Sequence, residues 1–389
     1  MKYTSPTLVV AGYNRLEPIK RALKSLSQAN YPDSPVNMVI SIDNDNKTSD
    51  LVAKYAEDFN WKYGNKEVIL HKENLGIKNH FNFCGDLTAK YGCVVFIEDD
   101  LYVAKDYYDY ILQALATFEN DERIAGISLF NYQRTEQISN PYPFNAIDDG
   151  GDNYFMQQAS WGQIWTKEMW DPYKKWFNEY GNNDYINSLA QVPGVIKKWP
   201  ATSWKKHYIT YMILHDKYYV FPRIALCSNF DDPGTNRTLK TVYYQSPMLL
   251  SQKKFQFKTF DESISIYDSF FELLPEKLKE LNPSLEPFDF EVNLYNSKNL
   301  ETINKEWILG SGIGAKVAHR FSKKMKPHEL NIIYNMEGKG INLTSKEGYK
   351  TNELINKSES FIYYYRNLLS IKEMRAVLKY KLNKKLNRI

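Results

Sequence analysis

Three consecutive carboxylates, Glu98, Asp99 and Asp100, directly follow an apolar run at residues 94–97. Crowding three negative charges at the end of a predicted strand is unfavourable unless a cation lies beside them. Carboxylate oxygens suit a hard divalent ion, Mg²⁺ or Mn²⁺, and such ions usually bridge to substrate phosphates. The cluster therefore predicts a metal site, with a solvated acidic turn as the alternative.

Alternating strands and helices position this cluster. The predicted strands span residues 7–11, 36–42, 67–70, 94–97 and 124–130, and the predicted helices span residues 18–28, 49–59, 78–90 and 106–118. Repeated β-α units with short connections indicate an α/β fold with a mostly parallel sheet. The acidic cluster would lie at the carboxyl end of the fourth strand, where open sheets of this kind bind their ligands.

The ends of the first three predicted strands carry further polar residues. They are Gly12, Asn14 and Arg15 after the first strand, Asp43 after the second and His80 just beyond the third. A carboxylate such as Asp43 can accept a hydrogen bond from a nucleotide base, and Arg15 and His80 can contact phosphate or ribose. The pattern predicts a nucleotide-binding edge, although the first loop lacks a glycine-rich phosphate fingerprint.

Composition bounds the class of protein. The chain has 389 residues, 43% of them hydrophobic, and a formal net charge of only +4, so it can bury a large core and is not expected to bind nucleic acid. Its three cysteines have no metal-ligand spacing, which favours a reducing compartment. Residues 1–6 lead into a strand without a signal peptide, and no apolar run is long enough to span a bilayer, so we expect a cytoplasmic protein.

Beyond residue 130 the pattern is less regular. Residues 137–153 indicate a mobile loop, and residues 231–236 a turn-rich loop able to close over a ligand. Tryptophans gather between residues 161 and 204, as in an acceptor-binding subdomain or an aromatic core. Residues 363–389 carry eight basic residues and one acid, with apolar residues at helical spacing. This tail suits an anionic membrane surface, or a helix docked on the body.

The ordered series VVAGYNR, VISIDND, GIKNHF and VVFIEDDLYVAKDYYDY (residues 9–15, 39–45, 76–81 and 94–110) resembles the nucleotide-binding half of GT-A glycosyltransferases. It is similar to the N-acetylglucosaminyltransferases that initiate complex N-glycans and to bacterial family-two-like relatives. The resemblance covers about the first 130 residues and continues weakly through residues 160–165. It implies a Rossmann-like GT-A fold with an acceptor-side subdomain and a helical C-terminal extension.

Residue by residue, the resemblance implies that Gly12, Asn14, Arg15, Asp43 and His80 contact the nucleotide. Three more roles follow from the acidic motif: Asp99 near the ribose, Glu98 near the donor sugar and Asp100 on the Mn²⁺ or Mg²⁺ ion. We expect four parts, namely a nucleotide-sugar-binding half (1–130), an acceptor-binding and catalytic half (131–240), an extension of unassigned role (241–362) and the basic tail (363–389).

The chain departs from the family at the catalytic base. The family has a carboxylate near the start of the helix before the strand that ends in proline, here Pro222, and this chain has Lys205 and Lys206 there. Either lysine could instead pair with a donor phosphate or an acidic acceptor. An insertion would shift the alignment onto Asp184, our predicted base, and the alternatives are His207, Asp231 and Asp232.

The resemblance implies a metal-dependent, inverting transfer from a UDP-sugar of the GlcNAc or galactose type. We expect a glycan or lipid-linked acceptor in synthesis of a bacterial surface polysaccharide, capsule or lipopolysaccharide, with the enzyme peripheral on the inner face of the cell membrane. Two alternatives belong to other classes: a catalytically silent sugar-nucleotide-binding or scaffold module, and a nucleotidyltransferase. Release of UDP would indicate sugar transfer, and release of pyrophosphate would indicate nucleotidyl transfer. Binding without release of either product would indicate the silent module.

Overall fold

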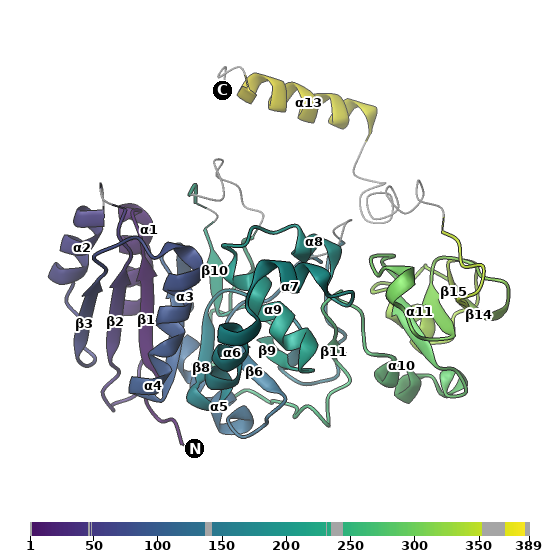
Figure 1. Cartoon of the computed structure of the whole chain (residues 1–389), viewed down its shortest axis with the longest axis horizontal. Coiled ribbons are helices and arrows are strands. Elements are labelled where there is room, and N and C mark those ends of the chain that lie inside the picture. The colour runs from purple at the N-terminus through teal and green to yellow at the C-terminus, as the bar shows by residue number, and fades with distance from the viewer. Residues whose placement is uncertain are drawn as a thin grey trace. The chain divides into compact units, whose positions relative to one another are not determined.

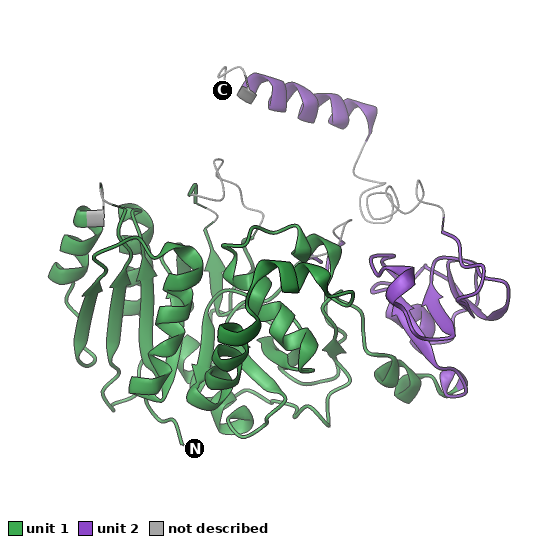
Figure 2. Cartoon of the chain, in the orientation of Figure 1, with its two compact units in different colours: residues 1–133, 145–283 green, residues 134–144, 284–389 purple. Residues whose placement is uncertain are grey.

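The computed structural model describes residues 2–45, 47, 49–136, 142–230, 232–234, 244–351 and 370–385. Contacts divide the chain into two compact units (Figure 2). The first holds residues 1–133 and 145–283, and the second holds residues 134–144 and 284–389. The four predicted parts, bounded at residues 130, 240 and 362, stay a prediction, because this division reflects contacts and not function.

Four parallel strands at one side of a nine-stranded sheet form the half of the first unit that was predicted to bind a nucleotide (Figure 1). They are β1 (Thr7–Gly12), β2 (Met38–Ile42), β3 (Lys66–Leu70) and β4 (Cys93–Glu98), in the order β4-β1-β2-β3. In the register, Ala11 of β1 lies between Ser41 of β2 and Glu98 of β4. The carboxyl ends of these three strands therefore meet at one edge, as predicted.

Apolar side chains explain why these segments pack as they do. Strands β1, β2 and β4 are buried almost throughout, which is typical of parallel strands covered on both faces. Helix α1 (Leu16–Ser27) buries Ile19, Leu23 and Leu26 on one face, as its spacing predicts. A Cβ atom at Gly12 would lie 2.7 Å from the Ile19 side chain, so glycine allows the helix to pack close to the strand end.

The sheet continues with strands of mixed direction. Strand β8 (Gln163–Thr166), which was not predicted, lies antiparallel between β4 and β6 (Ile124–Ser128). Beyond β6 follow β9 (Tyr218–Pro222) in parallel, β7 (Asn153–Met156) antiparallel to it, and β11 (Ile266–Tyr267). The predicted α/β class with a mostly parallel sheet is confirmed.

An aromatic core packs beside β4 and β8. Helices α3 (Gly76–Asp86), α6 (Lys167–Tyr180) and α9 (Trp204–Leu214) contact one another there. Trp165, Trp170 and Tyr208 are fully buried, and their rings lie within about 6 Å of each other. Most of the tryptophans between residues 161 and 204 thus belong to the core, one of the two predicted interpretations.

A small ribbon follows the acidic cluster. Strand β5 (Leu101–Val103) pairs antiparallel with β10 (Cys227–Asn229). The Phe230 amide extends this pairing by donating to the Asp100 carbonyl at 3.0 Å. The ribbon therefore brings the segment that begins at Asn229 to the carboxyl end of β4.

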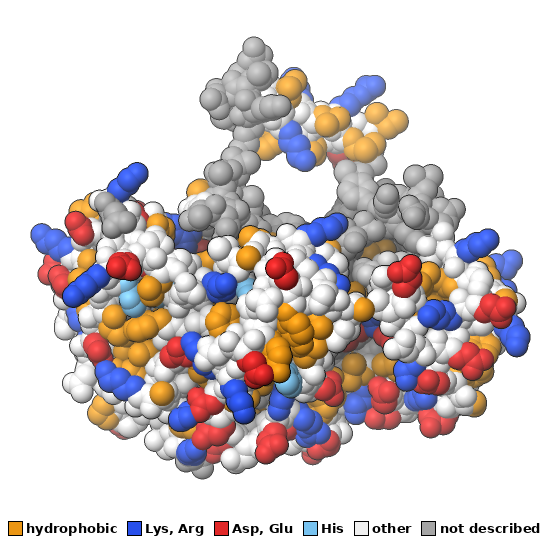
Figure 3. All heavy atoms as spheres, viewed as in Figure 1, with side chains coloured by type: hydrophobic (Ala, Val, Ile, Leu, Met, Phe, Trp, Pro, Cys, Tyr) orange, Lys and Arg blue, Asp and Glu red, His pale blue; other side chains and the backbone are white. Residues whose placement is uncertain are grey.

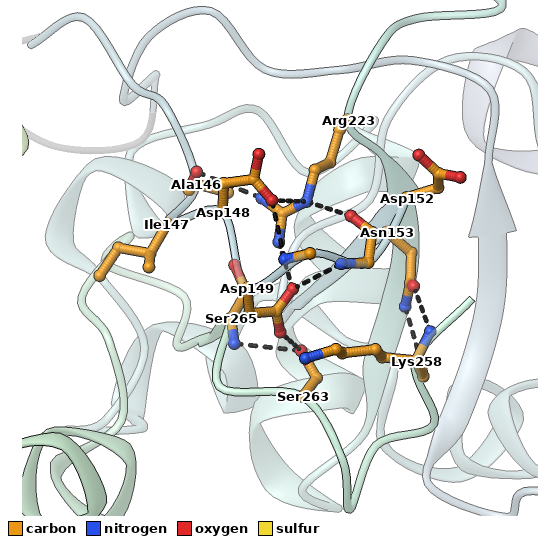
Figure 4. Close-up of polar contacts among 12 residues, drawn as sticks. Ala146, Ile147, Asp148, Asp149, Asp152, Asn153, Arg223, Lys258, Ser263 and Ser265 are labelled. Carbon is orange, nitrogen blue, oxygen red and sulfur yellow. Dashed lines mark hydrogen bonds and ion pairs between the residues drawn. The ribbon is translucent and has the colours of Figure 1, made fainter. Parts of the chain in front are cut away.

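Polar contacts hold the segment between residues 145 and 153 (Figure 4). The Arg223 guanidinium donates to Asp149 at 2.7 Å, and the other oxygen of Asp149 accepts from the Ser263 hydroxyl at 2.8 Å. Asn153 exchanges two hydrogen bonds with the Lys258 backbone. The predicted mobile loop of residues 137–153 overlaps this held segment, and its residues 137–141 lie outside the described ranges.

The second unit contains a four-stranded sheet that was not predicted. Its order is β12 (Phe290–Asn293), β13 (Trp307–Gly310), β15 (Ile341–Ser345) and β14 (Val317–Phe321). A short helix, α11 (Glu329–Ile333), follows β14. The predicted basic tail is described over helix α13 (Ile371–Lys385), and its residues 363–369 and 386–389 lie outside the description. The C-terminal extension is thus part strand and part helix.

Further helices and 3₁₀ turns complete the described part of the chain. They are α2 (Ser49–Asp58), α4 (Thr88–Tyr91), α5 (Tyr107–Phe118), α7 (Asn183–Ser188), α8 (Gly194–Lys197), α10 (Pro275–Leu281), and the 3₁₀ turns Pro283–Leu285 and Leu300–Thr302. Within the described ranges, none of the helices has the length and hydropathy to cross a bilayer. Charges of both signs are interspersed over the face of the molecule shown in Figure 3.

Candidate functional site

The strand ends line a cavity of about 480 Å³ in the first unit. All eight residues predicted to bind the donor or the metal line it: Gly12, Asn14, Arg15, Asp43, His80, Glu98, Asp99 and Asp100. They come from the loop after β1, the end of β2, helix α3 and the end of β4. The structure therefore brings together side chains that are up to 88 positions apart in the sequence, while their individual roles stay predictions.

Arg15 lies against the acidic cluster. Its Nε donates to Asp99 Oδ2 at 3.2 Å, and its Nη2 donates both to Asp99 Oδ1 and to Asp100 Oδ2, the latter at 3.1 Å. Arg15 immediately precedes helix α1, so the packing of α1 against β1 fixes the position of the Arg15 backbone. One permanent positive charge thus partly offsets three crowded carboxyl groups.

Glu98 is the least satisfied member of the cluster. Its Oε2 atom is buried and has no hydrogen-bond partner among the described residues. Burial, and then the charges of Asp100 and Asp99, raise the pKa of Glu98 to about 8. A buried acid held in its neutral form beside two other carboxyl groups indicates that the cluster lacks positive charge.

A divalent ion fits this donor set. The described residues contain no group of three or more His, Cys, Asp or Glu side chains arranged to hold a metal by themselves. Mg²⁺ and Mn²⁺ do not require one, because they are commonly held by one or two carboxylates together with substrate phosphates. Asp100, 16% exposed at its side chain and facing the cavity, can supply that carboxylate.

Asp43 joins the end of β2 to the start of α3. Its Oδ1 accepts from the backbone amides of Asn44 at 2.9 Å and Leu75 at 2.8 Å, and its Oδ2 accepts from Gly76 at 3.0 Å. A negative charge is favourable at this helix N-terminus. Since a carboxylate offers about four acceptor positions, three backbone donors leave room for about one contact with a ligand.

His80 lies in a polar chain beneath the cavity. Its Nε2 lies 2.8 Å from the Ser41 hydroxyl, which lies 3.0 Å from Nε2 of His71. Burial is the main cause that lowers the pKa of His80 to about 4. The imidazole is therefore neutral near pH 7, so it can contact a nucleotide as a hydrogen-bonding group but not as a cation.

The segment after β10 forms part of the site, and sequence reasoning identified its turn and, as alternative bases, Asp231 and Asp232. Asn229 donates to Asp100 Oδ1 at 3.0 Å, a contact that was not predicted. Asp232 and Gly234 line the cavity, Asp232 pairs with Arg21 of α1, and that guanidinium lies 3.9 Å from the Phe230 ring centroid. The signal for this segment in the sequence was its clustered Asp, Pro and Gly residues, which indicate a turn.

Aromatic side chains also line the cavity. They are Tyr13, Phe81, Phe96, Trp161, Trp204 and Tyr244. Trp204 stacks on Phe81 with ring centroids 4.2 Å apart, and Trp161 meets Tyr244 edge to face at 5.0 Å. Such faces can pack against a sugar ring. The surplus of aromatic residues in the chain hid these few from sequence reasoning.

The predicted catalytic base is not placed with the other site residues. Asp184 is exposed in the first turn of the surface helix α7 and is absent from the cavity lining. An acid there is explained by the helix dipole alone. Of the alternatives, His207 is buried with its Nδ1 2.8 Å from the Ser203 carbonyl, Asp231 lies outside the described residues, and Asp232 lines the cavity.

The two lysines at the expected base position differ. Lys206 is fully buried, and its ammonium lies 2.6–3.1 Å from four neutral oxygens, those of Asn183, Asn187, Lys197 and Trp199. It ties α7 and the end of α8 to α9, a structural role. Lys205 extends over the rings of Tyr132 and Trp161, at 5.4 and 5.5 Å from their centroids.

Comparisons with known proteins show what the first part of the chain is similar to. Residues 7–163 match the family model described as Glycosyl transferase family 2. Over 102 residues the chain is 24% identical to an alpha-1,3-mannosyl-glycoprotein 2-beta-N-acetylglucosaminyltransferase of Arabidopsis thaliana. That stretch covers 25% of this chain and 23% of the relative, so the chain spans about a quarter of the length of the curated protein it matches.

Solved structures show distant similarity only. S. aureus TarS 1–349 is 15% identical with a TM-score of 0.35, over 58% of this chain and 60% of that chain. Its complex with UDP-GlcNAc is 17% identical with a TM-score of 0.31, over 57% and 59%. A mannosyltransferase from Pyrobaculum calidifontis, in complex with GDP-Man and Mn²⁺, is 18% identical with a TM-score of 0.26, over 33% and 43%.

Proposed function

We propose that this chain is an enzyme that transfers a sugar from a UDP-sugar, because residues 7–163 match the family model described as Glycosyl transferase family 2. The observation that carries the proposal is the shared cavity, in which the acidic end of β4 faces Arg15 and Asp43. The curated relative transfers N-acetylglucosamine according to its name, which supports a donor sugar of the GlcNAc or galactose type. The proposed product has an inverted anomeric centre.

In this proposal the strand ends hold the donor. The loop of Gly12 and Asn14, with Asp43 and His80, contacts the nucleoside, and Arg15 contacts the diphosphate as a charge-assisted donor. Asp99 lies near the ribose, and Glu98 near the donor sugar. Asp100 holds Mn²⁺ or Mg²⁺. When bound, this ion supplies positive charge that offsets the charge of the leaving diphosphate.

The reaction is a displacement at the anomeric carbon. The acceptor hydroxyl oxygen forms a bond to this carbon while its bond to the diphosphate oxygen breaks, and that electron pair leaves with UDP. The hydroxyl proton passes to a carboxylate base. We assign this role to Asp232, because it lines the cavity and Asp184 does not. Trp161 and Tyr244 offer aromatic faces for the acceptor sugar.

The acceptor and the location complete the proposal. A glycan or lipid-linked acceptor on the way to a bacterial surface polysaccharide, such as capsule or lipopolysaccharide, would bring the enzyme to the inner face of the cell membrane. Helix α13 suits such a surface: Ile371, Leu378 and Leu382 are exposed on one side, and basic residues flank them. Apolar and cationic groups arranged in this way favour an anionic lipid headgroup region.

A panel of nucleotide sugars, followed by mass spectrometry with and without Mn²⁺, tests the function. UDP release dependent on the metal is the expected result. Release of pyrophosphate would instead indicate nucleotidyl transfer, and binding of UDP without turnover of any donor would indicate a silent module. The lysines at the expected base position are the observation that favours this last alternative.

The base assignment has a matched pair of variants. Asp232→Asn should lower kcat by about 10²-fold or more while the affinity for UDP stays close to wild type. Asp184→Asn, the same substitution on the exposed helix α7, should leave kcat nearly unchanged. The opposite ranking of the two variants would return the role of base to Asp184.

A further inference from the structure

Each oxygen of the proposed metal-binding carboxylate already accepts a hydrogen bond from a donor of the protein itself. Asp100 Oδ1 accepts from Asn229 at 3.0 Å, and Asp100 Oδ2 accepts from Arg15 at 3.1 Å. The same guanidinium grips neighbouring Asp99 through both of its oxygens. A divalent ion that approached Asp100 in the absence of a nucleotide donor would therefore meet the positive charge of Arg15, which lies 3.1 Å from Asp100 Oδ2.

Arg15 could contact a second anionic partner, a bound diphosphate, within the same cavity. Its side chain lines the cavity and is 23% exposed, so it is not locked into the protein interior. A bound diphosphate in this cavity would offer it several anionic oxygens in exchange for two carboxylates. A divalent ion on Asp100 would favour the exchange, because two cations within a few ångströms of each other repel.

Building on the function proposed above, we propose that Arg15 is an internal counter-ion that occupies the metal subsite until the donor arrives. The diphosphate then draws Arg15 off Asp100, and the vacated carboxylate accepts the divalent ion. The donor and the ion thus bind as a linked pair, and the empty enzyme has little affinity for the metal. Arg15 has two opposed effects: it weakens binding of metal alone and strengthens binding of nucleotide.

Thermodynamic linkage makes this inference measurable. If UDP raises the affinity for Mn²⁺ by some factor, Mn²⁺ raises the affinity for UDP by the same factor. Part of that factor comes from direct contact between metal and phosphate, which any metal–nucleotide site has. The rest comes from the displacement of Arg15, and that part disappears when Arg15 is replaced by a neutral side chain.

The experiment titrates Mn²⁺ alone, and then UDP at saturating Mn²⁺, into wild type and Arg15→Gln, with electron paramagnetic resonance and calorimetry as readouts. Arg15→Gln should bind Mn²⁺ alone about ten-fold tighter than wild type and UDP about ten-fold weaker. Arg15→Lys keeps the charge but loses the two-pronged grip, so its Mn²⁺ affinity should lie between the two. If a melting curve shows that Arg15→Gln is unfolded, Arg15→Lys replaces it in the comparison with wild type.

Arg21→Gln is the matched control. It removes an equal charge from the neighbouring turn of α1, where Arg21 pairs with Asp232 and not with the acidic cluster. Its affinity for Mn²⁺ alone should change by less than about three-fold, the size of a longer-range charge effect. An equal gain in Arg21→Gln and Arg15→Gln would overturn the inference, because net charge and not occupancy would then be the cause.

Two failures remain distinguishable. If wild type binds UDP with Mn²⁺ but Arg15→Gln binds Mn²⁺ alone no more tightly than wild type, Arg15 is not the counter-ion and the proposed function stands. If wild type binds no UDP at any Mn²⁺ concentration, the proposed function itself is rejected.

Discussion

Replacement of Asp43 by Asn should destabilise the first unit far more than its near-identical shape suggests. Three backbone amides converge on this carboxylate, two on Oδ1 and one on Oδ2, and the residue is only 3% exposed. An asparagine can keep the two bonds at one oxygen as neutral hydrogen bonds. Its amide NH₂ group would then face the N–H of Gly76, so a donor would meet a donor.

The magnitude follows from these contacts. Hydrogen bonds to a charged group contribute about 1.5–3 kcal/mol and neutral ones about 0.5–1.5, so weakening two bonds costs about 2 kcal/mol and losing the third about 2 more. Removal of the charge from the α3 N-terminus adds about 0.5 kcal/mol. We therefore expect the free energy of unfolding to fall by about 4.5 kcal/mol, a large part of a typical total of about 5–15 kcal/mol.

Urea unfolding of Asp43→Asn against wild type measures this value. Asp45→Asn is the control, since Asp45 accepts a backbone bond from Lys47 at 2.9 Å in a surface turn and should cost less than about 1 kcal/mol. UDP affinity should fall with Asp43→Asn, because α3 provides Gly76, Ile77 and His80 to the cavity wall. A loss of stability below about 1 kcal/mol would refute the view that this carboxylate clamps β2 to α3.

Three further predictions concern the metal, acid stability and the tail. Asp100→Asn should abolish Mn²⁺-dependent UDP binding in calorimetry, and unchanged affinity in a folded variant would reject Asp100 as the ligand. Burial lowers the pKa of His207 from 6.5 to about 4, so the stability contributed by neutral His207 is fully present above pH 6.5 and is lost progressively as the pH falls from 6.5 to 4. In urea unfolding, His207→Phe should therefore lose about 2.5 kcal/mol less than wild type between about pH 7 and about pH 4.5, and parallel losses would contradict this. Deletion of residues 363–389 should weaken sedimentation with anionic vesicles but not with neutral ones, and equal sedimentation with anionic vesicles would eliminate the tail as a membrane anchor.

The half that was predicted to bind the donor could be predicted in its fold because its signals are local. Each strand is an apolar run that ends in polar residues, and parallel strands bring their carboxyl ends together whatever their separation in sequence. Asp43 and Asp100 could therefore be assigned to one edge of the sheet from the amino-acid sequence alone. The individual hydrogen bonds could not be predicted, since a pattern of side chains does not show which backbone amides donate to Asp43.

The rest of the first unit was less predictable because its geometry depends on pairings distant in sequence. Asn229 reaches Asp100 only because β10 pairs with β5. Each of these strands has three residues, too few for an alternation of polar and apolar residues to be recognised. Strand β8 is four residues long and buried throughout, so no alternation marks it. Asp184 was chosen by aligning across an insertion, and the cavity instead receives Asp232 from a turn that the sequence did indicate.

The four oxygens around Lys206 have a practical consequence. An amine that is fully enclosed and bonded on every side cannot meet an acylating or methylating reagent until α7, α8 and α9 separate. Lys206 should be labelled more slowly than the exposed lysines of this chain. Its rate of labelling in a mass-spectrometric time course would then report how often this corner of the molecule opens in solution.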